Sequence, residues 1–148
     1  MYRIEKTNYG VKFTFSGFLD KEEMKRWAEE VVAGTKSLPK GFCVFMDMRG
    51  MQPLPRDAWL MMQRAQEQAI KAGMARSVQV VDDPITSMQF KRFARNTGIS
   101  DRERQIDASS VLDWEKMAMD WLIRGIEPLS PSISDTGFMK AFTDPERS

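Results

Sequence analysis

One stretch decides the fold. It reads Gly-Phe-Cys-Val-Phe-Met-Asp-Met-Arg-Gly-Met-Gln-Pro-Leu-Pro-Arg-Asp-Ala and spans residues 41–58. Residues 42–46 are apolar at every position, which is typical of a strand covered on both faces. Polarity returns at Asp47, so we expect the strand to end there, and Gly50 and Pro53 then predict a loop before a helix that begins at Pro55. Open α/β sheets bind ligands at the carboxyl ends of their strands, so this turn is the first place to look for a site.

Before this stretch, the sequence predicts a hairpin and a helix. Residues 2–6 and 11–16 have the pattern of two strands, with a turn at residues 8–10. Asp20 is positioned to cap a helix that runs to about Ala33. A strand, a helix and another strand imply a right-handed crossover and a parallel strand pair.

After the central turn, helices and strands alternate. The expected elements are a helix over 55–72, a strand over 77–81, a helix over 84–96 capped by Asp83, a charged edge strand over 102–106 and a last helix that Ser110 and Asp113 open and that ends near Gly125. We therefore predict an α/β fold, with a mixed sheet of about five strands and helices on both faces. The predicted division is one domain over residues 1–125 and a Pro- and Ser-containing tail over residues 126–148.

Composition narrows the chemistry. The chain of 148 residues has a net charge of +1, no histidine and one cysteine, Cys43. Without histidine it lacks the commonest general base and metal ligand, so we expect no enzyme activity, no metal and no cofactor. The near-neutral charge favours no nucleic-acid partner. No apolar run approaches the length of a membrane span and no signal-peptide pattern occurs at the start, so we expect a cytoplasmic protein.

Three short stretches resemble a known family. Residues 13–20 (Phe-Thr-Phe-Ser-Gly-Phe-Leu-Asp) look like the entry to the first helix of STAS domains, and residues 47–54 (Asp-Met-Arg-Gly-Met-Gln-Pro-Leu) look like the STAS loop. Residues 118–122 (Ala-Met-Asp-Trp-Leu) look like the close of the SpoIIAA-like branch, also called STAS/CRAL-TRIO-like proteins. The resemblance covers about residues 2–125. It implies a STAS-type fold and a small regulatory or ligand-binding module.

The chain departs from this family at the position that the family phosphorylates. STAS anti-anti-sigma factors continue from the loop into Asp-Ser-Ser/Thr-Gly, whereas this chain has Pro-Arg-Asp-Ala at residues 55–58. Arg56 stands at the acceptor serine, and Arg49 replaces the earlier serine of the loop. Because no hydroxyl side chain remains between residues 47 and 58, we do not carry the phosphorylation switch over to this protein.

The candidate binding residues lie where the central strand and the next strand end, or in the loops that follow. They are Asp47, Met48, Arg49, Met51, Arg56, Asp57, Asp82 and Asp83. One interpretation is that these residues form a polar rim around a small ligand or a partner, with Arg49 or Arg56 binding an anionic group. The other is that these residues are helix caps and surface ion pairs, since Asp57 suits the first turn of a helix.

Methionines and basic residues leave further alternatives open. Seven of the 12 methionines lie on elements near the central strand or its loop: Met46, Met48, Met51, Met61, Met62, Met74 and Met88. They either fill the core or line a pocket for a lipid-like molecule.

The basic residues Lys91, Arg92, Arg95, Arg102 and Arg104 lack interleaved aromatic residues, so we interpret them as a solvated face. Two functions follow: a non-enzymatic interaction module with a protein partner, or a carrier of a small apolar ligand.

The tail suggests a way of assembling. Phe138, Met139 and Phe142 are large apolar residues that follow a Pro-containing connection. Leaving them in water would forgo about 1.5–3 kcal/mol each, so we expect them to cover apolar surface. The prediction is a homodimer that uses the tail; the alternative is a monomer whose tail folds back on its own domain.

Overall fold

The structure is a computed structural model, which describes residues 1–97, 99 and 101–128. Of the tail predicted over residues 126–148, residues 129–148, which include Phe138, Met139 and Phe142, lie outside this part of the chain. The elements are β1 (Tyr2–Lys6), β2 (Gly10–Gly17), α1 (Lys21–Thr35), β3 (Cys43–Met51), α2 (Arg56–Lys71), β4 (Arg76–Val81), α3 (Pro84–Thr97), β5 (Glu103–Asp107) and α4 (Trp114–Arg124).

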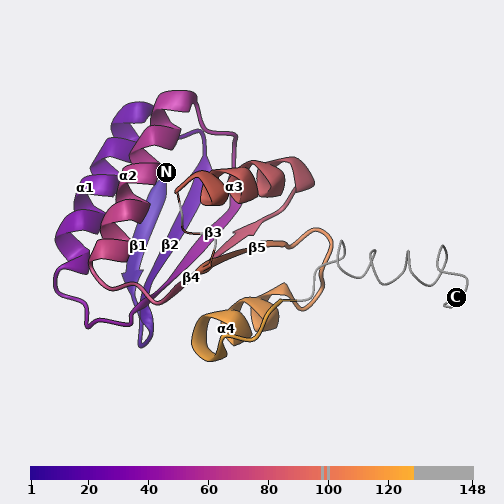
Figure 1. Cartoon of the computed structure of the whole chain (residues 1–148). Coiled ribbons are helices and arrows are strands. Elements are labelled where there is room, and N and C mark those ends of the chain that lie inside the picture. Colours follow the sequence, from indigo (N-terminus) through magenta and orange to yellow (C-terminus); the bar gives the residue numbers. More distant parts are fainter. Residues whose placement is uncertain (98, 100, 129–148) are drawn as a thin grey trace, which may run out of the picture.

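The strands form one five-stranded sheet in the order β1-β2-β3-β4-β5. β1 is antiparallel to β2, and every other neighbouring pair is parallel. Each parallel connection passes through a helix, and right-handed crossovers in one direction along the sheet place α1, α2 and α3 on the same face. Figure 1 shows these three helices above the strands and α4 below them. The predicted α/β fold, with a mixed sheet and helices on both faces, is confirmed.

The larger core lies between the sheet and the three crossover helices. At its centre, the Trp27 ring of α1 packs edge-on against Phe13 and Phe15 of β2, with centroid distances of 5.3 and 5.2 Å. Strand alternation explains this contact, because residues two apart on β2 point to one face. Trp59 of α2 and Phe90 of α3 form a second ring contact at 4.7 Å, which ties the last crossover helix to its neighbour.

The smaller core lies under α4 on the opposite face. Val78 and Val80 of β4 are fully buried there against Trp121 and Leu122 of α4. The Trp121 Nε1–H donates a 2.9 Å hydrogen bond to the backbone oxygen of Ser77. A single helix of 11 residues therefore covers this face, and its docking depends on a few large side chains.

The expected end of the central strand is wrong by four residues. Pairing with β4 stops where Asp47 faces Val80, as the return of polarity indicated. β3 nevertheless continues to Met51, because its end still pairs with β2 after a register shift, with Gly50 opposite Ser16. Asp47 therefore marks the end of the pairing with β4 but not of the pairing with β2.

Two helix starts have the predicted side-chain caps, whereas Asp113 precedes α4 without a side-chain cap bond. Asp20 accepts a hydrogen bond from the Glu23 backbone N–H at 2.9 Å, and Asp83 accepts one from Thr86 at 2.7 Å, so both predicted caps are confirmed. Pro55 is the extended residue just before α2 rather than its first helical residue, with ψ at 159°.

Candidate functional site

The carboxyl edge of β3 holds an ion pair between two of the predicted site residues. The Arg49 Nε–H and Nη2–H groups donate to the two carboxylate oxygens of Asp47, both at 2.9 Å. The Arg49 backbone N–H adds a 3.2 Å bond to the same carboxylate. On its other side, the guanidinium lies 4.2 Å from the ring centroid of Trp114, at the start of α4. Residues two apart on one strand share a face, which explains why this pair forms.

Burial and charge set the protonation of this pair. Burial raises the pKa of Asp47, but hydrogen bonds from Arg49 outweigh that effect and hold the pKa below its usual value. The same hydrogen bonds raise the pKa of Arg49, and Glu115 and Asp82 add to that effect through their charges. Arg49 thus carries a permanent positive charge inside an acidic surrounding. In this structure the carboxylate that Arg49 binds is that of Asp47, on the same strand.

The other predicted site residues lie in different places. Met48 and Met51 are buried in the larger core, at 1% and 7% exposure. Asp83 caps α3 through both of its carboxylate oxygens, which bind the backbone and hydroxyl of Thr86. Asp82 is exposed beside it. The structure therefore groups Asp47, Arg49 and Asp82 at one edge and separates them from the methionines.

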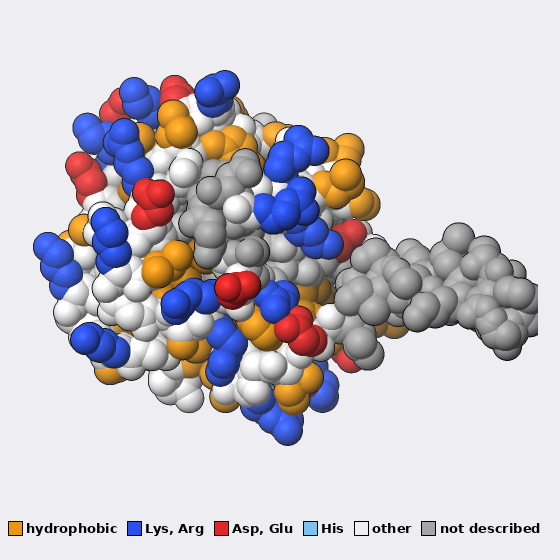
Figure 2. Space-filling model, in the orientation of Figure 1, with side chains coloured by type: hydrophobic (Ala, Val, Ile, Leu, Met, Phe, Trp, Pro, Cys, Tyr) orange, Lys and Arg blue, Asp and Glu red, His pale blue; other side chains and the backbone are white. Residues whose placement is uncertain are grey.

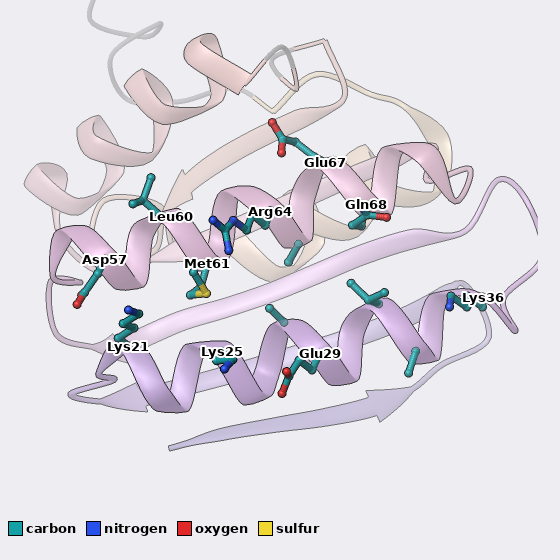
Figure 3. A pocket seen from close by; sticks show the side chains of 14 residues that line it. Lys21, Lys25, Glu29, Lys36, Asp57, Leu60, Met61, Arg64, Glu67 and Gln68 are labelled. Carbon is teal, nitrogen blue, oxygen red and sulfur yellow. The ribbon is translucent and has the colours of Figure 1, made fainter.

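Arg56 and Asp57 belong to the first turn of α2, and Asp57 lines a surface groove that the sequence analysis missed. The groove has a volume of about 840 Å³ and runs between α1 and α2 (Figure 3). Its apolar lining includes Ala28, Val32, Leu60, Met61 and Ala65. Ala28, Met61 and Ala65 are buried and form the floor.

Charged side chains line the rim of the groove: Lys21, Lys25, Glu29 and Lys36 from α1, and Asp57, Arg64 and Glu67 from α2. Figure 3 shows Arg64 pointing from α2 toward α1. Within the described residues, none of these charged side chains forms an ion pair or a hydrogen bond. A sequence signal for the groove did exist, since Ala28 and Ala65 occupy inward positions but are too small to fill the space between two helices.

A buried polar cluster lies between β4, β5 and α2. The Glu103 side chain is only 2% exposed, and its carboxylate accepts hydrogen bonds from Ser77 at 2.9 Å, from Gln66 at 3.3 Å and from Gln105 at 3.3 Å. Burial raises the pKa of Glu103 from 4.5 to about 8, although the bonds from Ser77 and Gln105 act in the opposite direction. From the sequence, this residue is expected in a charged edge strand over residues 102–106. In the structure it faces inward, because its register partner Ser77 lies on the face that α2 covers.

The methionines fill the core rather than lining a large chamber. Six of the seven that we singled out are buried: Met46, Met48, Met51, Met61, Met62 and Met74. The internal cavity that Met46 and Met74 help to line measures about 20 Å³. That volume suits about one water molecule and not a lipid.

The described residues contain neither a cluster of metal ligands nor a membrane-spanning helix. Among them, no three His, Cys, Asp or Glu side chains come together as a metal site. Within the same part of the chain, no helix has the length and the apolar character needed to cross a bilayer.

Comparisons with known proteins support the fold. A crystal structure of an uncharacterised protein from the DUF3478 family, from Shewanella loihica PV-4 and described as having a SpoIIAA-like fold, matches 82% of this chain and 92% of that one. The TM-score is 0.57 and the sequence identity is 12%. No protein-family model matches the chain, and no curated protein matches it. The chain therefore has a SpoIIAA-like fold, as the three short stretches predicted.

Proposed function

We propose that this protein is a non-enzymatic interaction module that binds a partner protein in the groove between α1 and α2. The observation that carries this proposal is the combination of a buried apolar floor with a rim of charged side chains that have no partner among the described residues. A SpoIIAA-like fold is consistent with such a module. The absence of a hydroxyl side chain between residues 47 and 58 means that any regulation works without phosphorylation of that loop.

The shape of the groove suits a helix of the partner. α1 has 15 residues and α2 has 16, so the two helices form a track about 22 Å long at 1.5 Å per residue. An amphipathic helix in such a track buries its apolar side on residues such as Leu60 and Met61, while its flanks meet the charged rim. Leu60 is 46% exposed, so a partner gains apolar burial there that the isolated chain lacks.

Site-specific photo-cross-linking tests this proposal in cells. The photoreactive residue benzoylphenylalanine replaces Arg64 in the groove, and in a control protein it replaces Arg26, which is exposed on α1 outside the groove. We expect one discrete protein adduct from position 64 that position 26 does not give. Leu60→Asp should abolish that adduct, because it places a charge on the apolar contact surface. Identical adducts from both positions would refute the groove assignment.

The carrier of a small apolar ligand is not proposed as a second function. It depended on a Met-lined pocket, but the internal cavity that Met46 and Met74 help to line measures only about 20 Å³. Met48, Met51 and Met62 are packed in the larger core. Native mass spectrometry of the purified protein remains a direct check on this point, since a retained apolar ligand would have to occupy a different site.

A further inference from the structure

The outer face of α3 combines exposed apolar and basic side chains. Ile85 is 70% exposed and Met88 is 61% exposed. Lys91, Arg92 and Arg95 follow at helical spacing and are exposed as well. Figure 2 shows blue and orange side chains next to one another over the region where Figure 1 places α3.

Nothing in the described part of the chain neutralises this face. α3 contains no acidic residue, and Lys91, Arg92 and Arg95 form no ion pair or hydrogen bond there. The apolar residues occupy the first half of the helix and the cations occupy the second half. A helix that lies on a membrane needs apolar and basic side chains along its whole length. In α3 the apolar and basic side chains are separated along the helix axis, which instead fits a compact protein surface with an apolar end and an acidic end.

The chain carries such a surface itself, in the turn that leads from β5 to α4. Leu112 at this turn is 102% exposed. Asp113 and Glu115 flank it, are both exposed, and form no ion pair among the described residues. Here again a large exposed apolar side chain stands beside exposed charged ones, but the charges have the opposite sign.

We infer that a second copy of this chain covers the α3 face, with the Leu112 turn of each protomer docked on α3 of the other. Ile85 and Met88 of one protomer contact Leu112 of its partner, while the α3 cations meet Asp113 and Glu115. α3 follows β4 and the turn follows β5, and these strands are parallel neighbours, so the start of α3 and the turn both lie at the same edge of the sheet, where the two strands end. A two-fold axis can therefore satisfy both contacts at once, which gives a closed, isologous dimer.

Helix dipoles explain part of this arrangement but not all of it. Cations near the end of α3 and acids near the start of α4 each stabilise their own helix. Helix dipoles do not explain why the large apolar side chains of Ile85, Met88 and Leu112 are exposed to water. Burial of each would contribute favourable free energy. This inference goes beyond the proposed function, because it concerns the edge of the sheet near β5 and not the α1–α2 groove.

Charge exchange between two variants tests the inference. The first variant is Arg92→Glu with Arg95→Glu, and the second is Asp113→Lys with Glu115→Lys. By sedimentation equilibrium of the full chain, we expect the unsubstituted protein to dimerise and each variant to dimerise at least about tenfold more weakly, because like charges then face each other. An equimolar mixture should form a heterodimer, because both of its contacts are attractive: one has the native charges and the other has them exchanged.

Further measurements separate this outcome from damage to the fold. Leu112→Ser changes a fully exposed side chain, so it should weaken the dimer while circular dichroism stays unchanged. Arg26→Glu, on the opposite side of the helical layer, should leave the dimer intact. A monomeric unsubstituted protein at the highest soluble concentration, or a mixture of variants that stays monomeric, would overturn the inference.

Discussion

Ser77 on β4 donates a 2.9 Å hydrogen bond to the Glu103 carboxylate on β5, and Glu103 is almost entirely buried from solvent. The two residues are register partners in a parallel pair. This contact couples the stability of the sheet edge to the protonation of one carboxyl group, because burial disfavours its charged form.

The first prediction concerns pH. The pKa of Glu103 rises from 4.5 to about 8 on folding, so the folded chain holds a proton that the unfolded chain releases. The stabilisation from this group is therefore fully present below pH 4.5, falls as the pH rises toward 8 and is lost above that. Urea denaturation across this range should show the decline.

The matched variant for this prediction is Glu103→Gln, which keeps the shape and cannot ionise. Its free energy of unfolding should vary less between pH 4.5 and 8 than that of the unsubstituted protein. Glu22→Gln, on an exposed position of α1, should leave the profile as it was. Parallel profiles for the unsubstituted protein and Glu103→Gln would show that Glu103 does not titrate in this window.

The second prediction concerns the pair at the end of β3. Arg49→Ala leaves the Asp47 carboxylate, whose side chain is only 10% exposed, without its donors. We expect a loss of about 1.5–3 kcal/mol at neutral pH, the range for hydrogen bonds to a charged group. Because the pKa of Asp47 is lowered in the folded protein, this loss should shrink as acidification protonates the carboxyl group.

A double-mutant cycle with Asp47→Asn measures the coupling in this pair directly. The combined variant should lose less free energy of unfolding than the sum of the two single variants, since each single change already removes the shared bonds. Additive losses would mean that the contact contributes nothing to stability.

The third prediction uses two glycines. Gly10 has φ at +149°, and a Cβ atom there would lie 2.2 Å from the backbone oxygen of Cys43, so Gly10→Ala should destabilise the protein by more than about 2 kcal/mol. Gly34 lies in α1 with open space around it, so Gly34→Ala should stabilise by about 0.5–1 kcal/mol. Thermal unfolding of both variants checks the opposite signs.

The fourth prediction concerns the docking of α4. Leu122 is fully buried and its neighbour Ile123 is 50% exposed. Leu122→Ala should cost about 2–5 kcal/mol through lost burial and the cavity left behind, whereas Ile123→Ala should cost under about 1 kcal/mol. Equal effects in urea denaturation would contradict the placement of α4 on the sheet.

The sequence by itself determined the elements and the fold class, because these depend on local and repeating features. Alternation along β2, the apolar run at the start of β3 and the caps at Asp20 and Asp83 each act within a few residues, and all of them appear in the structure. The Asp47–Arg49 contact also had a local basis, since residues two apart on a strand share a face. The sequence named both residues without predicting that they would bind each other.

Only the tertiary structure decided what lies around those residues. Glu103 stands between two arginines in a charged stretch, and its burial follows from the register that sets it beside Ser77 under α2. The groove exists because α1 and α2 lie side by side on the same face with small side chains between them. Trp114 reaches Arg49 because α4 docks on the opposite face. Each of these contacts joins segments far apart in the chain, and a local pattern carries no information about which distant segment will supply the partner.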